Sequence, residues 1–418
     1  MPPVLPESVT ATLDRLVPWP DDGTRADGPV AVDATDRLLL TEAAPLLAGL
    51  GRSRADDGDQ AAGVDDVVVL GDRFGALTVG ALALGAAGLR GHTDAVTAEW
   101  AIARNLEDSA ATLGVGRPVR SFGALGPELL AGARLVLLQL PKSLAELTEI
   151  VEAVARYAHD DVILLAGGRD KHMSRTMNDV LADRFREVRA TLGRGKSRAL
   201  VASGVRPDAR AAAPLYPVTE RLTDSELLAA ATPTSAAHGP DHVVVVAHGA
   251  AFAGATLDHG TRFLLSTAGR WPAASRVHDA VDLGCGTGLL ATVLSRRYPD
   301  AVVVATDRSA AAVTSTRATL AANDLTAEVL LDDAGDGLAD ASADVVLLNP
   351  PFHDRTAVST DAAHRMFATA GRILRPGGEL WCVYNTRLRY RGSLSRAVGP
   401  TDHVAQDPRF TVTRSRKP

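Results

Sequence analysis

The stretch AVDLGCGTGLL, residues 280–290, decides the fold. An apolar, strand-like run leads into a glycine turn, and a helix is expected to begin near Leu289. Gly284, Gly286 and Gly288 lack Cβ atoms, so the turn can be tight and its backbone can approach a ligand closely. We therefore predict a strand, a cofactor-binding loop and a helix in this order.

Acidic residues around this loop indicate which cofactor it takes. Asp307 ends the next apolar run, AVVVATD at 301–307, roughly 20 residues after the glycines, where a carboxylate can accept hydrogen bonds from ribose hydroxyls. Asp282 precedes the glycines, and its charge suits an ammonium or sulfonium group. A dinucleotide fingerprint would need Gly or Ala where Leu289 stands. S-adenosylmethionine fits these features, and its predicted site comprises Asp282, Gly284, Gly286, Gly288, Asp307 and Asp333.

A second motif, NPPF at 349–352, follows the apolar run DVVLL. Two prolines fix φ and remove backbone donors, which leaves carbonyl groups free to accept hydrogen bonds. The Asn349 side-chain oxygen and the Pro350 carbonyl can each accept one N–H of an exocyclic amine, and Phe352 supplies a stacking face. We predict Asn349, Pro350 and Phe352 as the catalytic residues of an amino-directed methyl transfer.

The chain also contains an internal duplication. A shift of 213 residues places Leu70, Gly71, Gly75 and Asp94 over Leu283, Gly284, Gly288 and Asp307. A shift of 210 places ARLVLLQLPKS, residues 133–143, over ADVVLLNPPFH, residues 343–353. Apolar strand-like runs alternate with helical stretches in both halves, which is the pattern of a parallel sheet covered by helices. The sequence thus predicts an α/β fold built twice.

The first copy has lost the residues of the predicted chemistry. Arg73 stands where the second copy has Gly286, and Lys142 stands in the place of Phe352. These cations either contact phosphate or are ordinary solvated charges of a structural domain.

Length and composition agree with two globular domains. A chain of 418 residues exceeds one ordinary core, and its 46% hydrophobic and 22% charged residues exclude a disordered or fibrous protein. An Ala- and Pro-rich stretch at 207–240 suggests the boundary. We predict residues 1–235 as the degenerate domain and residues 236–418 as the catalytic domain.

Charge and cysteine content limit the class of protein further. A net charge of −6 argues against coating nucleic acid by bulk electrostatics, although a local basic patch is compatible with it. Two cysteines make no disulfide framework, and no signal peptide or membrane-spanning run is visible, so we expect a cytoplasmic protein. No metal site is expected, because His238, His242 and His248 lack further ligands at the required spacing.

The motifs together carry a family resemblance. DLGCGTG, TD and NPPFH resemble the amino-directed class I methyltransferases that use S-adenosylmethionine. The runs LDHGTRFLLST at 257–267 and TRATLAAN at 316–323 are similar to those of ribosomal RNA guanine-N2 methyltransferases with two tandem methyltransferase-like domains. The segments at 140–154 and 167–181 are closer to the large-subunit branch than to the small-subunit branch.

The resemblance implies two tandem doubly wound, Rossmann-like domains, of which the first is degenerate, and a final hairpin within residues 403–417. It implies methyl transfer to the N2 amino group of a guanine, with ribosomal RNA or a ribosomal subunit as partner and a monomeric enzyme. Alternatives are an amino methyltransferase for adenine N6 or a protein glutamine, and a noncatalytic RNA-binding ribosome-assembly protein.

Overall fold

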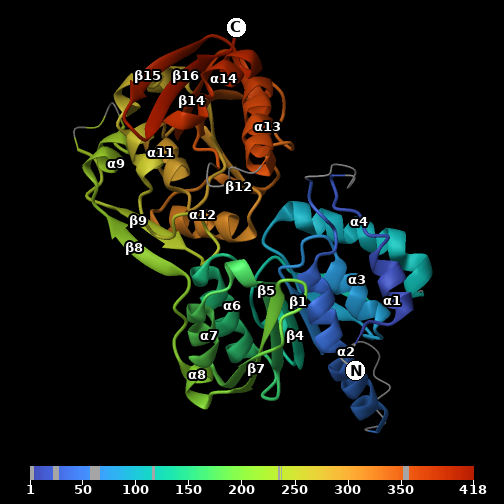
Figure 1. Ribbon diagram of the computed structural model, residues 1–418. Helices are drawn as coiled ribbons and strands as arrows, with labels where there is room; N and C mark the ends of the chain where they lie inside the picture. The colour runs from blue at the N-terminus through green and yellow to red at the C-terminus, as the bar shows by residue number, and fades with distance from the viewer. Residues whose placement is uncertain are drawn as a thin grey trace. The chain divides into compact units, whose positions relative to one another are not determined.

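The chain folds into two compact units. The computed structural model describes residues 4–21, 28–56, 66–114, 118–233, 236, 238–351 and 357–418, with the backbone alone for 51–56 and 357–360. The units comprise Met1–Leu215 and Tyr216–Pro418 (Figure 1).

Each unit contains a seven-stranded sheet, and the two sheets have the same topology. The strand order is β3-β2-β1-β4-β5-β7-β6 in the first unit and β12-β11-β10-β13-β14-β16-β15 in the second. Five strands pair in parallel in each sheet, and the last two add an antiparallel hairpin. The prediction of two tandem doubly wound domains is confirmed, as is the final hairpin.

The elements of the first unit follow the order expected of a doubly wound fold. Its strands are β1 (Val67–Leu70), β2 (Leu89–His92), β3 (Val119–Ser121), β4 (Leu135–Gln139), β5 (Ile163–Arg169), β6 (Phe185–Ala190) and β7 (Ser197–Val205). Its helices are α1 (Glu7–Leu13), α2 (Ala34–Asp56), α3 (Ala76–Ala83), α4 (Val96–Leu113), α5 (Pro127–Leu130), α6 (Leu144–Tyr157), α7 (Arg175–Ala182) and α8 (Pro207–Ala211), with a 3₁₀ turn at Asp170–His172.

The second unit begins with a small two-stranded arm, β8 (Val218–Leu222) and β9 (Val243–Ala247), before its main sheet. The main strands are β10 (Asp279–Leu283), β11 (Val302–Asp307), β12 (Glu328–Leu331), β13 (Ala343–Leu348), β14 (Leu374–Asn385), β15 (Thr401–Gln406) and β16 (Phe410–Arg416). The helices are α9 (Ser225–Ala230), α10 (His259–Leu265), α11 (Leu289–Arg297), α12 (Ala310–Ala322), α13 (Ala357–Ile373) and α14 (Arg391–Ala397), with 3₁₀ turns at Ala268–Arg270, Ala274–Arg276 and Thr386–Leu388.

Both sheets are buried on two faces, which is why their central strands are rich in apolar residues. In β10, Ala280 packs with α9 to α11, whereas Val281 and Leu283 pack with α13 and α14. Figure 1 shows α11 and α13 on opposite sides of this sheet. Successive side chains of a strand point to opposite faces, so one short apolar run serves two core layers. The carboxyl ends of the parallel strands are left to carry polar residues.

The division between the units differs from the predicted boundary at 235/236. Residues 216–235 belong to the second unit, because β8 pairs with β9 and Leu227 of α9 packs in the same core as Leu264 and Tyr298. The Ala- and Pro-rich composition at 207–240 indicated the region of the domain boundary. Its position within that region depends on the pairing of β8 with β9, which makes both strands part of the second unit.

Candidate active site

The glycine loop lies where β10 ends and α11 begins. Gly284, Gly286 and Gly288 all have left-handed φ angles, of 85°, 56° and 80°. Gly288 is needed for space as well, because a Cβ there would lie 2.9 Å from the Thr316 Cα, whereas a Cβ on Gly286 would meet no heavy atom of the described residues within 4 Å. The loop therefore packs against α12 at one end and leaves an open space at Gly286, where a ligand can approach the backbone.

Asp307, the last residue of β11, is joined to this loop. One carboxylate oxygen accepts a hydrogen bond from the Gly286 N–H at 2.9 Å, and the other accepts from the Ser309 N–H at 3.0 Å. A carboxylate has about four acceptor sites, so it retains capacity for further donors. Asp307 lines the cavity, as the ribose-binding role predicts.

Asp282 lies beneath the loop and is fully buried. Its Oδ2 accepts a hydrogen bond from the Ala291 N–H at 2.8 Å, whereas its Oδ1 is buried and has no partner among the described residues. Burial raises the pKa of Asp282 to about 7. Asp282 is not among the described residues that line the cavity, so its carboxyl group lies below the loop and not at the cavity surface.

Asp333 lines the cavity and is almost fully buried, but its carboxylate has a partner that the sequence did not reveal. Arg365 of α13 donates from Nη1 to Oδ2 and from Nη2 to Oδ1, the latter at 3.2 Å. These hydrogen bonds raise the pKa of Arg365. Arg365 therefore fixes the plane of a carboxylate that faces the ligand space.

Asn349 follows β13 and has a fixed orientation. Its Nδ2 donates to the Asp258 Oδ2 at 2.8 Å and to the Thr261 Oγ1 at 2.9 Å. Its Oδ1 is buried and has no hydrogen-bond partner among the described residues. Asp258 caps α10 by accepting from the N–H groups of Gly260 and Thr261, so its own position is set by the helix. We name Asp258, Thr261 and Asn349 the amide clamp.

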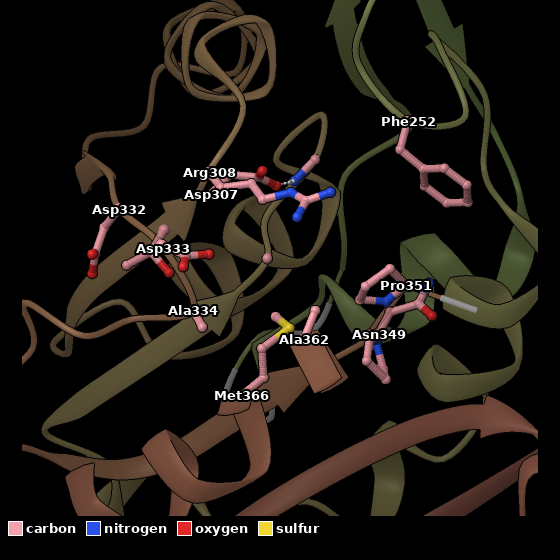
Figure 2. Close-up of a pocket in the computed structure, with 14 residues that line it drawn as sticks. Phe252, Asp307, Arg308, Asp332, Asp333, Ala334, Asn349, Pro351, Ala362 and Met366 are labelled. Carbon is pink, nitrogen blue, oxygen red and sulfur yellow. Dashed lines mark hydrogen bonds between the residues drawn. The ribbon is translucent and has the colours of Figure 1, made fainter. Parts of the chain in front are cut away.

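One cavity of about 260 Å³ is lined by six of the predicted site residues, namely Gly284, Gly286, Asp307, Asp333, Asn349 and Pro350, whereas Asp282 and Gly288 are not in its lining. Pro351 lies beside Asn349, opposite Asp332 and Asp333 (Figure 2), and Pro350 also belongs to the lining. Phe352 lies outside the described residues. Sequence reasoning missed Phe252, which is 48% exposed and reaches the cavity from the segment after β9.

The equivalent position in the first unit is filled by its own side chains. Arg73 forms an ion pair with Asp33 at 2.9 Å and donates to the Gln139 Oε1 at 3.3 Å, while Gln139 donates to Asp36. Burial and the neighbouring negative charges raise the pKa of Asp36 to about 7. The Arg73 guanidinium thus has an internal partner, which favours the interpretation of this cation as a charge of a structural domain.

Neither a metal site nor a membrane-spanning segment was expected from the sequence. Within the described ranges, no group of three or more His, Cys, Asp or Glu side chains is arranged to hold a metal ion. No described helix is both long enough and apolar enough to cross a membrane.

Comparison with known proteins places both units. Residues 242–414 match the methyltransferase small domain, and residues 10–206 match the RLMG N-terminal domain. The ribosomal RNA large subunit methyltransferase G of Streptomyces avermitilis is 35% identical over 401 residues, covering 96% of this chain and 98% of that protein. The protein of the same name from Pseudomonas aeruginosa is 32% identical, with 84% and 87% covered.

A solved structure resembles the whole chain. It is a T. thermophilus 16S rRNA N2 methyltransferase in complex with AdoMet and guanosine, with a TM-score of 0.67, 20% sequence identity, and coverage of 97% of this chain and 99% of that one. At this identity the likeness concerns the fold, and it extends over both tandem units.

Proposed function

This chain belongs to the ribosomal RNA large subunit methyltransferase G family, and on that basis we propose that it transfers a methyl group from S-adenosylmethionine to the N2 amino group of a guanine in ribosomal RNA. The choice of N2 is supported by the structural neighbour, whose description names an N2 methyltransferase with AdoMet and guanosine.

One observation carries the proposal: the buried, unpartnered Oδ1 of Asn349. A buried acceptor without a partner is costly unless a ligand supplies a donor. Because Asp258 and Thr261 both accept from Nδ2, the amide cannot turn over without placing its oxygen against the Asp258 carboxylate. The amide clamp therefore presents an acceptor, which an amine requires.

The cavity also fits the proposed cofactor. Around Gly286 the backbone is open to a ligand, the Asp307 carboxylate lines the cavity beside it, and Asp282 supplies a buried oxygen beneath the loop that has no partner among the described residues. We assign Gly284, Gly286 and Asp307 to the amino acid and ribose parts and Asp333 to the base. Gly288 holds the loop against α12. When bound, S-adenosylmethionine supplies an electrophilic methyl group on a sulfonium.

In the proposed reaction Asn349 and the Pro350 carbonyl accept the two N–H groups of the guanine amine. This directs the nitrogen lone pair toward the methyl group and fixes the two reactants at short range. The amine proton becomes acidic as the new N–C bond forms, so water can take it and no strong base is required. Phe352 is assigned to stacking on a base that has left its helical stack.

We assign the chemistry to the second unit and RNA holding to the first. The first unit has Arg73 in the cofactor loop, whereas exposed cations stand at the carboxyl edge of its sheet. They include Lys171, which follows β5, Arg189 near the end of β6, and Lys196 in the turn between β6 and β7. This turn lies at the carboxyl edge because Ser197, the first residue of β7, pairs with Arg169, the last residue of β5. Cations at this edge can position an RNA backbone.

We further propose that the enzyme acts as a monomer in the cytoplasm, where it meets ribosomal RNA or a ribosomal subunit. In support, the cavity-lining residues all come from one unit of a single chain, so a second copy is not required to complete the site.

The proposal is tested by offering the protein naked ribosomal RNA, assembled ribosomal subunits and release factors in parallel, with labelled S-adenosylmethionine. We expect label in RNA, as N2-methylguanosine after digestion to nucleosides. N6-methyladenosine or methylated glutamine would replace this proposal with one of its alternatives. No transfer to any substrate by a protein that binds RNA would favour a noncatalytic role.

A further inference from the structure

The carboxyl edge of the second unit's sheet is divided by charge. Strand order places the ends of β12, β11 and β10 on one side of β13, and the end of β14 and the β15–β16 turn on the other. The first side carries three acids, Asp307, Asp332 and Asp333, and one cation, Arg308, around the cavity. The second side carries Arg387, Arg389 and Arg409, which we name the arginine rim, and one acid, Asp407, whose Oδ1 accepts from the Arg409 and Phe410 N–H groups. Asn349 lies between the two sides, at the end of β13.

The arginine rim is exposed, and its charges are free. Among the described residues, none of the three guanidinium groups has an ion pair or a hydrogen bond. Other arginines of the same hairpin are paired: Arg414 with Asp402 and Arg416 with Glu379. This difference affects anion binding, because a paired guanidinium group must lose its partner before it binds another anion.

The segments that carry the arginine rim lie near the amide clamp. The Thr386 N–H donates to the Arg409 carbonyl at 2.9 Å, which joins the segment containing Arg387 to the β15–β16 turn. Phe410, which follows Arg409, and the Asn349 Oδ1 both lie close to Gly260: a Cβ atom built on this glycine would be 3.3 Å from the Phe410 ring and 3.4 Å from the Asn349 Oδ1. The turn that carries Arg409 is therefore near the acceptor for the target amine.

We infer that the arginine rim is a binding surface for the phosphodiester backbone next to the target nucleotide, so that RNA approaches over β14 and β16 while the cofactor lies over β10 to β12. This inference rests on the proposed function. A guanine captured at Asn349 brings its own flanking phosphates to this edge. Planar guanidinium groups bind phosphate with paired hydrogen bonds, and free ones contribute without first breaking an ion pair.

The charge division also explains the direction of approach. A phosphate over Asp307 and Asp332 would be repelled, whereas the cationic cofactor would be repelled by the rim. The order of the strands in the sheet thus places the cofactor on one side of Asn349 and the RNA backbone on the other.

The test compares two double variants of the full-length protein. Arg387→Gln with Arg409→Gln removes two of the three rim charges, and Arg389, which ends the 3₁₀ turn at Thr386–Leu388, is left in place. The matched control, Arg221→Gln with Arg276→Gln, removes two exposed charges from β8 and from the segment before β10, away from the carboxyl edge. Anisotropy with a ribosomal RNA fragment is measured over a range of salt, together with calorimetry of S-adenosylmethionine and methyl transfer.

We expect the rim variant to bind RNA at least tenfold more weakly and its plot of log affinity against log salt to lose roughly 0.7 to 0.9 units of slope per phosphate contact. Cofactor affinity should not change, and the control should resemble the wild type. Unchanged RNA affinity and slope in the rim variant, an equal loss in the control, or binding of polyglutamate as tight as that of RNA would overturn the inference.

Failure of the proposed function has a different signature. Wild-type protein that binds RNA but transfers no methyl group refutes the proposed function. The salt dependence of RNA affinity in the rim variant and in the control then still decides whether the rim contacts phosphate. Wild-type protein that does not bind RNA at all overturns both.

Discussion

Replacing Asp258 by Asn is expected to misorient Asn349 while leaving the cofactor site intact. The Asp258 carboxylate accepts from three donors: its Oδ1 from the Gly260 N–H, and its Oδ2 from the Thr261 N–H and the Asn349 Nδ2. At the Oδ2 position a carboxamide NH₂ group would face two donors, the Thr261 N–H and the Asn349 Nδ2, and at the Oδ1 position it would face the Gly260 N–H. In either orientation the negative charge that holds the Asn349 Nδ2 is lost, so the Asn349 amide is held less firmly and its Oδ1 is withdrawn from the substrate amine.

The size of the effect follows from the hydrogen bond that is lost. A hydrogen bond to a charged group contributes roughly 1.5 to 3 kcal/mol, and each 1.4 kcal/mol is about tenfold in an equilibrium or a rate. We expect kcat to fall roughly 10- to 100-fold and the Kd for S-adenosylmethionine, measured by calorimetry, to stay within about twofold. Asn349→Ala should lower kcat at least about a hundredfold with the same unchanged Kd.

A double-mutant cycle separates this role from a structural one. If Asp258 acts through Asn349, then Asp258→Asn should lower turnover no further once Asn349→Ala is present. A simple loss of the α10 cap would instead lower the thermal midpoint and add its effect in both backgrounds. Wild-type turnover in Asp258→Asn, or fully additive losses in the cycle, would refute the clamp.

Further predictions concern the cofactor, pH and the first unit. Calorimetry should show one S-adenosylmethionine site per chain, and Gly286→Arg should abolish it, since the side chain enters the open space and φ is left-handed; two equal sites would contradict the assignment. The folded pKa of Asp282, about 7, lies above its ordinary value near 3.8, so its contribution to stability is complete below about pH 4 and is lost as pH rises through 7. Asp282→Asn should therefore gain stability relative to wild type between pH 4 and 8 in urea titrations, and a constant difference would count against the buried carboxyl. Lys171→Gln with Arg189→Gln should weaken binding of ribosomal RNA and flatten its salt dependence, whereas unchanged slopes would make the first unit structural only.

The sequence by itself determined the features that depend on consecutive residues. The run at 280–290 specified a strand, a turn that needs left-handed glycines and a helix, and all three are formed. Asp307 and Asn349 could be placed at the carboxyl edge because each ends or follows an apolar strand, and parallel strands bring such ends together. The duplication was visible for the same reason, since equal spacing produces the same strand order twice.

Only the tertiary structure decided which hydrogen-bond and ion-pair partners orient the side chains of the site. Asp258 and Asn349 are 91 positions apart, and Arg365 and Asp333 are 32 apart, so their contacts depend on how α10 and α13 pack and not on any local pattern. The pairing of Arg73 with Asp33, and of β8 with β9 across the expected boundary, has the same origin. Local propensity acts over a few residues of backbone, whereas the orientation of a carboxylate or amide is set by whichever distant donors the packed core brings to it.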